Sequence, residues 1–534
     1  MCQMERLSTI AVSFVMCAVV TSDAAAQPLQ GRWRVWNATD GVEPDFTVNE
    51  AVADIDPDGN GPSGRRLFIG GDALAQFGLT TFGVVWYDPT ADCGAGAWSV
   101  PEPVLAPLNG SRFRDALAWD PDGAGPRPEW LILCPSTDLL WFGSTIIGNR
   151  IPRWNPELSN GAGGFEPMGG ELGRGDTGLW AQVATLWDRD GDGPNRAVPV
   201  IGGTFRSSPQ SFGTVAVWNP AGDAGAGSWE PVERIGVPNR SFLTDVGALT
   251  SWDPDGPGPK LPVLVAGGHD TLRQNGQSTP SYVAMWAPDP ATGEPDWLPM
   301  GTQLDRPVRD LTVWDPDGPG PMHDQVIAVG DFSYVNPSSL RGVARWDAEM
   351  GVWAALGSVS FFGSGPFTIE VWDPDGSGPQ RETLFIGGGR LFADGTIALG
   401  AVAFWDCDAS GLNGTWRALG ETSLTSYVTK LKAWDPTGTG AAPSQLVAAG
   451  NFRNFAGLPA QGVAAWGMPD FIAAPKRADL NRDGRVNVED LTRLLGGFGK
   501  TLFPGSGADV NSDGVVNVRD LIILLSEFAT GGCE

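Results

Sequence analysis

Histidine and tyrosine are scarce in this chain of 534 residues, which has only two histidines, His269 and His323, and four tyrosines. The sequence therefore offers almost no residues for a mechanism that needs a histidine cluster, or a histidine base beside a nucleophile. Basic residues are also few, since 35 Lys and Arg stand against 62 Asp and Glu, a formal net charge of −27. Nucleic acid and anionic membrane surfaces would be repelled, so neither is an expected partner.

Cysteine is too sparse for a disulfide framework, because the whole chain contains six. No C-x-x-C pair occurs, so a thiolate zinc site is not indicated. Cys134 lies in the apolar run 130–134 and is expected to be a small core residue. The pairing of the cysteines left after removal of a leader stays open; these are Cys93, Cys134, Cys407 and Cys533.

Long apolar runs are absent except at the N-terminus, where residues 7–20 are apolar and Ala24-Ala25-Ala26 follows. This pattern predicts a secretory signal peptide over residues 1–26. A membrane anchor is the alternative, but the run is shorter than the ~20 residues that span a bilayer. The sequence therefore predicts a secreted, extracellular or cell-surface protein that is not an integral membrane protein.

Glycine, proline and tryptophan are abundant, at 74, 44 and 23 residues, which indicates a folded, turn-rich, all-β protein. The phrase W-D-P-D-G-x-G-P and its variants recur, and their first aspartates are 58 to 68 residues apart. That spacing indicates seven copies of one structural unit. The aspartates are Asp56, Asp120, Asp188, Asp253, Asp315, Asp373 and Asp435.

Each repeat contains four short β-branched and aromatic runs separated by Gly, Pro and Asp, as in residues 308–357. Four strands per unit and seven units predict a seven-bladed β-propeller over residues 27–466. The seventh unit ends at Trp466 without its fourth strand, and a surplus strand of that kind lies at 31–37. This N-terminal strand is expected to close blade seven. Stacked β-sandwiches are the alternative, but they would not explain the incomplete last unit.

After a linker at residues 467–478, the composition changes and two twelve-residue loops follow, each with oxygen donors at the spacing that calcium requires. Each loop continues into an apolar segment suited to a helix. The sequence predicts two Ca²⁺ ions in a small all-α domain over residues 479–534. The expected ligands are Asp479, Asn481, Asp483, Arg485, Asn487, Asp490, Asp509, Asn511, Asp513, Val515, Asn517 and Asp520, with Arg485 and Val515 acting through their backbone carbonyls.

This C-terminal pair of loops resembles a type I dockerin, and the repeats resemble the kelch-like propeller repeats of secreted bacterial proteins and fungal Rax2-type cell-surface proteins. The dockerin resemblance implies a cohesin partner on a scaffold or cell surface, and a role in docking polysaccharide-degrading enzymes. Recognition of cohesin by type I dockerins depends on a Ser/Thr pair at loop positions 10 and 11. This chain departs from that pair, with Val488-Glu489 and Val518-Arg519 there. The alternatives are therefore a cohesin-like or unorthodox partner that contacts those residues, and a purely structural C-terminal cap.

Tryptophans that hold the same place in each repeat are expected to be packing residues. Four others break the pattern and are candidates for a binding surface: Trp36, Trp130, Trp141 and Trp180. The repeated D-P-D-G segments are interpreted as turns, but the run Asp188, Asp190, Asp192 is a candidate for a third calcium site. His269 is interpreted as a rim residue rather than a catalyst.

Most aspartates lie in the repeated turns, and no single repeat shows an obvious departure that would mark a catalytic site. The preferred hypothesis is therefore a non-catalytic binding or attachment protein whose propeller face engages a glycan or a protein. The alternative is a polysaccharide-degrading enzyme, a hydrolase acting on O-glycosyl bonds or a lyase, with its active site on that face. A glycosidase needs two carboxylates at a suitable separation, and 62 acidic residues leave that open.

Overall fold

The structure is a computed structural model of the full chain. It describes residues 32–35, 49–58, 65–71, 75–76, 79–80, 83–89, 91, 96–101, 105–107, 113–123, 127–137, 140–142, 145–146, 150–159, 163–170, 172, 179–191, 193, 196–205, 214–232, 243, 245–274, 277–333, 341–361, 365–374, 381–393, 395–420, 425–436, 444–467, 480, 486, 488–499, 510 and 515–528. The expected signal peptide lies outside the described residues.

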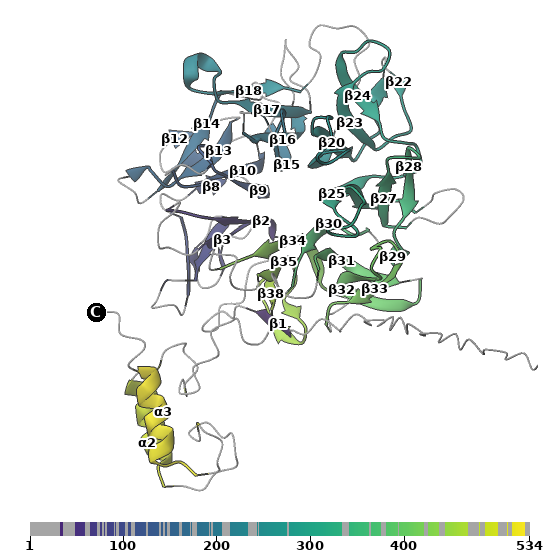
Figure 1. The fold of residues 1–534 in the computed structure, drawn as a ribbon. Helices are drawn as coiled ribbons and strands as arrows, with labels where there is room; N and C mark the ends of the chain where they lie inside the picture. The colour runs from purple at the N-terminus through teal and green to yellow at the C-terminus, as the bar shows by residue number, and fades with distance from the viewer. Residues whose placement is uncertain are drawn as a thin grey trace, which may run out of the picture.

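The chain has a propeller-like all-β fold in which four-stranded antiparallel groups follow one another around an axis (Figure 1). The first three are β2 (Asn49–Ile55), β3 (Arg66–Gly71), β6 (Val84–Asp88), β7 (Ala97–Ser99); β9 (Phe113–Trp119), β10 (Trp130–Thr137), β13 (Ile151–Asn155), β14 (Gly164–Met168); and β15 (Leu179–Trp187), β16 (Val198–Phe205), β17 (Val215–Asn219), β18 (Ser228–Pro231).

The next four groups repeat this order of strands. They are β19 (Val246–Trp252), β20 (Val263–Gly268), β23 (Val283–Pro288), β24 (Pro295–Pro299); β25 (Val308–Trp314), β26 (Gln325–Gly330), β27 (Val343–Asp347), β28 (Val352–Ala355); β30 (Thr368–Trp372), β31 (Thr383–Ala393), β32 (Ile397–Cys407), β33 (Gly414–Ala418); and β34 (Tyr427–Trp434), β35 (Gln445–Asn451), β38 (Val463–Gly467), β1 (Arg32–Val35).

Short strands and one 3₁₀ turn lie in the loops that connect these strands, most of them within a group. They are β4 (Ala75–Gln76), β5 (Leu79–Thr80), β8 (Leu105–Pro107), β11 (Leu140–Phe142), β12 (Thr145–Ile146), η2 (Asp223–Gly225), β21 (Arg273–Gln274), β22 (Gln277–Ser278), β29 (Val359–Phe361), β36 (Asn454–Phe455) and β37 (Leu458–Pro459).

The first strand of each group lies innermost, and these inner strands contact one another in a closed ring. Each contacts the next along the chain, and β34 contacts β2, so the ring has no open end. The inner strands are β2, β9, β15, β19, β25, β30 and β34.

The repeated tryptophans connect neighbouring groups, as their repeat positions predict. The indole N–H of Trp353 in β28 donates to the carbonyl of Met300 in the preceding group at 2.6 Å, and Trp416 donates to Leu356 in the same way at 2.8 Å. On the inner strands, Trp252 donates to the carbonyl of Asp324 in the following group at 2.9 Å. These indoles are buried, so each bond both fills the core and satisfies a polar atom.

The N-terminal strand β1 completes the last group, because Arg32–Val35 pair antiparallel with Ala464–Gly467 of β38. Trp33 occupies the place of the fourth-strand tryptophan: its ring lies edge-on to Trp466, with centroids 5.4 Å apart. Its indole N–H donates to the carbonyl of Leu419 at 2.7 Å, although the two residues are 386 positions apart. The two ends of the repeat region are thus joined by the same bond that links the interior repeats.

The glycine that ends each W-x-x-L-G run has a structural reason. Gly420 has φ +69° and lies against the next indole pair, where an added Cβ would come within 2.7 Å of Trp466. Gly357 has φ +70° and would meet Trp405 at the same distance. Both the backbone conformation and the close approach therefore require glycine.

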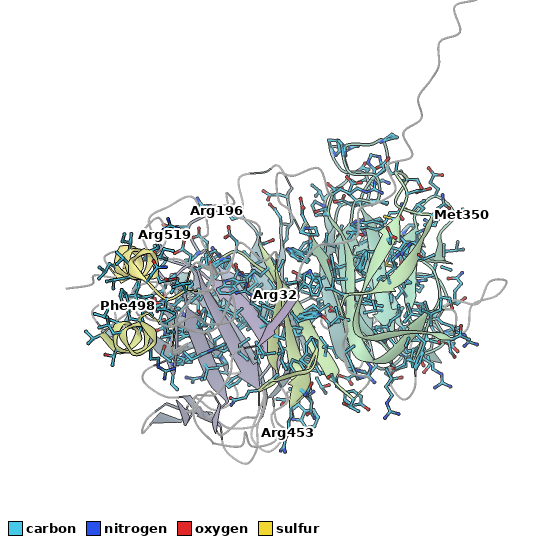
Figure 2. All side chains as sticks on the ribbon, turned by 90° about the horizontal axis from the view of Figure 1, so that it is seen from below. Arg32, Arg196, Met350, Arg453, Phe498 and Arg519 are labelled. Atoms are coloured by element: carbon cyan, nitrogen blue, oxygen red, sulfur yellow. The ribbon has the colours of Figure 1, made fainter. Side chains whose placement is uncertain are left out.

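The C-terminal segment contains two helices, α2 (Val488–Gly497) and α3 (Val518–Phe528), in the places where the sequence predicts them. They pack side by side, and Figure 2 shows them end-on, with Phe498 and Arg519 labelled. Leu494 and Leu524 are fully buried between them. No helix among the described residues is long and apolar enough to cross a membrane.

Candidate functional site

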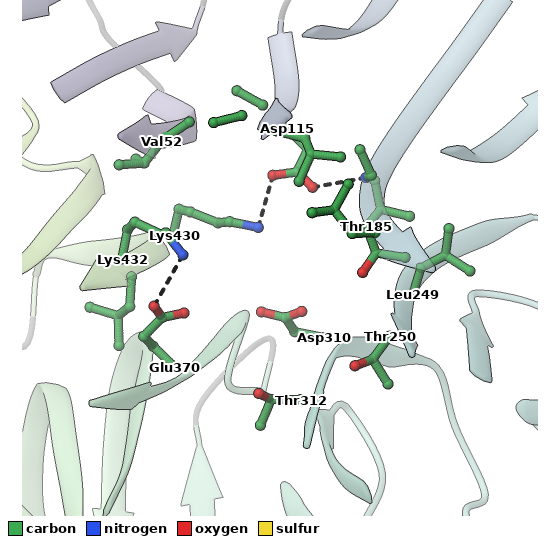
Figure 3. Close-up of a pocket in the computed structure, with 18 of the residues that line it drawn as sticks. Val52, Asp115, Thr185, Leu249, Thr250, Asp310, Thr312, Glu370, Lys430 and Lys432 are labelled. Carbon is green, nitrogen blue, oxygen red and sulfur yellow. Dashed lines mark hydrogen bonds and ion pairs between the residues drawn. The ribbon is translucent and has the colours of Figure 1, made fainter. Parts of the chain in front are cut away.

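A polar cavity of about 390 Å³ lies on the axis, enclosed by all seven inner strands (Figure 3). Its wall contains the charged side chains of Asp54, Arg65, Asp115, Glu129, Asp310, Glu370, Lys430 and Lys432. Charged groups away from bulk water need partners, so their arrangement defines what the cavity can bind.

Three of these charges depart from the repeat at one register position, the fourth residue before the residue that ends the inner strand. In the other four repeats that position holds Ala51, Val183, Ala248 and Thr368. Asp115, Asp310 and Lys430 hold it in the second, fifth and seventh repeats. The expectation that no repeat shows an obvious departure is therefore wrong for the inner strands. Alignment of the seven strands on their last residue would have found it.

Lys430 extends from β34 to the second repeat, and its Nζ lies 2.9 Å from Oδ1 of Asp115. Burial by itself lowers the pKa of Lys430, because it disfavours the charged form. The nearby carboxylates of Asp115 and Asp310 have a larger, opposite effect, so the pKa of Lys430 is raised above its usual range. The ammonium group thus stays charged between two carboxylates from opposite parts of the ring (Figure 3).

Asp310 is held by backbone donors rather than by a cation of its own. Its Oδ1 accepts the N–H of Leu311 at 2.9 Å, and its Oδ2 accepts the N–H of Ile369 in the next repeat at 3.0 Å. Asp115 likewise accepts the N–H of Ala184 in the next repeat at 3.0 Å. Burial raises the pKa of Asp310, and Lys430 opposes that rise.

The other charges of the cavity contact one another in two groups. Arg65 lies between Asp54 and Glu129, with contacts of 2.8 Å to each. Lys432 lies 3.4 Å from Glu370, and that carboxylate is the main reason that the pKa of Lys432 is raised. Each of these carboxylates therefore contacts a cation, which limits its use as a free acid or base.

A second polar network lies where the inner strands begin, and it includes His269. Nδ1 of His269 is 3.3 Å from Oδ2 of Asp245, and Nε2 is 3.3 Å from the guanidinium of Arg309. Arg309 in turn contacts Asp331 at 2.7 Å. The nearby imidazole of His269 is the main reason that the pKa of Asp245 is lowered. His269 is thus a connecting group within a rim network, as the sequence interpretation has it.

Two aromatic side chains are exposed at this same mouth. Trp180 is 54% exposed and Tyr427 is 40% exposed, and both lie seven residues before the last residue of their inner strands. Trp130, another predicted candidate, lies instead under the guanidinium of Arg153, which is 3.7 Å from the ring centroid, and packs on Trp119. Trp36 and the side chain of Trp141 lie outside the described residues.

The candidate site at Asp188 and Asp190 has the geometry of the other repeated turns. Oδ1 of Asp188 accepts the N–H of Asp190 at 3.2 Å, and Asp253 accepts from Asp255 at the same distance. Burial is the main reason that the pKa of Asp188 is raised. Asp192 lies outside the described residues, and within the described part of the chain no three acidic, His or Cys side chains form a metal-binding group.

Of the predicted calcium ligands, Asp490, Val515, Asn517 and Asp520 are described. In the second loop the structure brings three of them together: the Asn517 N–H donates to Oδ2 of Asp520 at 2.8 Å, and its side-chain amide donates to the Val515 carbonyl at 2.9 Å. In the first loop, Oδ1 of Asp490 accepts the N–H of Leu480 at 2.6 Å. The remaining predicted ligands, Asp479, Asn481, Asp483, Arg485, Asn487, Asp509, Asn511 and Asp513, lie outside the described residues.

Cys134 is fully buried in β10, as its apolar surroundings predict, and burial raises the pKa of its thiol. Cys407 is free and half-buried beside Arg381. Cys93 and Cys533 lie outside the described residues.

No family model and no curated protein matches this chain. Among solved structures, the chain is similar to BBS1N, determined in complex with ARL6DN, at 11% identity and a TM-score of 0.39, covering 83% of this chain and 97% of that one. It is also similar to Sqt1 of Saccharomyces cerevisiae, at 10% identity and a TM-score of 0.39, covering 79% and 96%. Likeness this distant carries no information on function.

Proposed function

We propose that this is a secreted, non-catalytic binding protein, in which one mouth of a seven-bladed propeller binds a glycan or protein and a calcium-binding, dockerin-like module attaches to a partner. The observation that carries the proposal is the pair of exposed aromatic rings, Trp180 and Tyr427, at the same register position of two repeats. Most aromatic rings here are buried as packing residues, whereas exposed rings offer flat apolar faces to a ligand.

The paired charges nearby favour binding over catalysis. His269 contacts both Asp245 and Arg309 at the same mouth, so its ring is held between two charged neighbours. Such a fixed set of donors and acceptors suits recognition of a polar ligand beside the aromatic rings.

Pull-down on insoluble polysaccharides tests this surface. The Trp180→Ala and Tyr427→Ala variants should each retain less bound protein than wild type. Met350→Ala removes an exposed apolar side chain from the loop after β27 and should bind as wild type does. Equal retention of all three variants would reject this mouth as the glycan-binding surface.

Calcium binding is proposed for the C-terminal module because its described donors fit the ion. Asp490 and Asp520 are fully buried carboxylates, the backbone N–H of Asn517 donates to Asp520, and the side-chain amide of Asn517 donates to the Val515 carbonyl. A buried carboxylate is costly without positive charge nearby, and calcium prefers an all-oxygen shell. The ion would be held by the predicted ligands of each loop and would join the loop to its helix.

Calorimetric titration of the full chain with Ca²⁺ tests this module. Two ions per chain are expected for wild type, and one for either Asp490→Ala or Asp520→Ala. Asp188→Ala is the matched control, because it removes an aspartate from the turn that is the third candidate site. Loss of an ion in that control would instead place calcium in the propeller.

Partner docking is proposed for an apolar stripe on these helices. Val518, Ile522 and Leu525 recur at helical spacing on α3 and are exposed, while Leu524 forms the buried core. Val488 and Leu495 are exposed on α2. The two loop residues at position 10, Val488 and Val518, belong to this stripe, so an apolar partner surface replaces the Ser/Thr contacts of the family that the module resembles. Exposed apolar patches of this kind mark interaction sites.

Ile522→Asp tests the stripe without changing the core, with Glu349→Gln on the propeller as a control for a distant change. A cohesin-type module or its host's cell surface should retain wild type and the control but release Ile522→Asp. Equal retention of Ile522→Asp would reject the stripe.

The second candidate function is a polysaccharide-degrading enzyme, which is favoured by the raised pKa of Asp310 near Asp115 in the axial cavity. Incubation with a polysaccharide panel and measurement of reducing ends tests it. Release of sugar that Asp310→Asn or Asp115→Asn abolishes would establish the enzyme and overturn the binding hypothesis.

A further inference from the structure

The charged side chains of the axial cavity sum to two negative charges, because five carboxylates stand against three cations. One of the two lies where Arg65 contacts both Asp54 and Glu129, and Lys432 is paired with Glu370. Lys430 lies between two carboxylates, Asp115 and Asp310, and its short contact is with Asp115. Asp310 is therefore left with two backbone N–H donors and no close cation among the described residues.

The side of the cavity next to Asp310 is lined by hydroxyl groups. Thr185, Thr250 and Thr312 hold the same register position, two residues before the strand-ending tryptophan, in three consecutive repeats. Figure 3 shows them along one side of the cavity, with Lys430, Lys432 and Glu370 on the other. The hydroxyl of Thr250 has a single long contact, 3.5 Å to the carbonyl of Ser251. No hydrogen bond from the hydroxyls of Thr185 and Thr312 to the described residues is seen.

We propose that this cavity binds the ammonium group of a small organic molecule, which pairs with Asp310 and donates to the threonine hydroxyls. One positive charge balances the carboxylate of Asp310, and three N–H donors match a carboxylate surrounded by hydroxyl oxygens. The volume of about 390 Å³ accommodates a molecule of the size of a monosaccharide.

Other ligand classes fit the cavity less well. A divalent metal ion requires six or more oxygen ligands and would approach the charged Lys430. An anion would find every cation already paired with a carboxylate. A neutral sugar would leave the buried charge of Asp310 uncompensated. This inference goes beyond the proposed function, because it concerns the axis and not the exposed aromatic rings or the calcium module.

Calorimetry on the full chain, with Ca²⁺ held constant, tests the proposal with three probes: glucosamine, ethanolamine and glucose. Wild type should bind at least one of the two amines and should not bind glucose. Asp310→Asn should weaken amine binding about tenfold or more, since it removes the charge that pairs with the ammonium group. Glu349→Gln removes an exposed acid from the same repeat and should bind as wild type does.

Thr312→Val provides a second variant that keeps every charge, and it should weaken amine binding while leaving the unfolding temperature close to that of wild type. Failure of both amines to bind wild type would overturn the proposal. Equal binding of glucose, binding unaffected by both Asp310→Asn and Thr312→Val, or displacement of the amine by Na⁺ or Ca²⁺ alone would also overturn it.

Discussion

Lys430 in the seventh inner strand contacts Asp115 in the second, with Nζ 2.9 Å from Oδ1, across the axis of the ring. Asp115 also accepts a backbone N–H from the third inner strand, at Ala184. One partly buried ion pair thus connects three repeats, two of which are not neighbours along the chain. It depends on the closed ring and contributes to it.

Lys430→Met should destabilise the protein by about 2–4 kcal/mol, because it leaves the buried carboxylate of Asp115 and the partly buried carboxylate of Asp310 without a cation. Urea unfolding measures the change. The exposed Lys260→Met is the matched control and should be close to neutral. Adding Asp115→Asn to Lys430→Met should restore part of the loss, and a further loss in the double variant would contradict the pair.

Wild type should gain stability relative to Asp310→Asn as the pH falls from neutral. Burial raises the folded-state pKa of Asp310, whereas the unfolded chain has the ordinary value of 3.8. Between these two pKa values the folded protein holds more protons, so a fall in pH favours folding. The difference in unfolding free energy between the two proteins, measured across a pH series, cancels the contributions of other acids. A difference independent of pH would contradict the assignment.

Trp33→Phe should cost about 1–3 kcal/mol, because it leaves the buried carbonyl of Leu419 without its donor. Trp353→Phe breaks the equivalent bond to Met300 inside the ring and serves as the matched variant. Thermal and urea unfolding should show similar losses for both. A neutral Trp33→Phe beside a destabilising Trp353→Phe would mean that the terminal strand contributes little to closure.

Removal of calcium by EDTA should increase hydrogen exchange in α2 and α3 and leave the inner strands of the propeller unchanged. The module has a small core around Leu494 and Leu524, so the ions would supply much of its folding free energy. Hydrogen-exchange mass spectrometry of the full chain resolves the two parts. Equal protection with and without calcium would contradict a calcium-dependent module.

The strand order could be predicted because tryptophans hold fixed positions in the strands of each group. Trp314 marks the end of an inner strand, and Trp353 marks the last strand of the same group, so the phrase spacing predicts both. The helices were predictable too, since Leu491 and Leu521 begin apolar segments directly after the loops.

The charged residues of the axial cavity could not be found from the repeat spacing alone. They differ visibly from the other repeats only when the seven inner strands are aligned on their last residues. Asp310 lies between apolar residues on β25, where an isolated aspartate has no local signature. Hundreds of residues separate Lys430 from Asp115. Their ion pair can be predicted only when it is known which strands face each other across the axis. Sequence spacing describes each repeat, whereas this contact arises only from closure.

The pairing of β1 with β38 has a consequence for biosynthesis. Arg32–Val35 leave the ribosome before every other strand of the repeats, yet their partner strand, Val463–Gly467, is translated after all the intervening repeats. The first strand must wait unpaired while the others assemble, and the final sheet can form only after the chain is released past residue 467. Truncation upstream of Val463 would remove β38, so β1 would have no partner strand and the edge of β35 would be exposed. Unpaired strands and exposed sheet edges promote self-association.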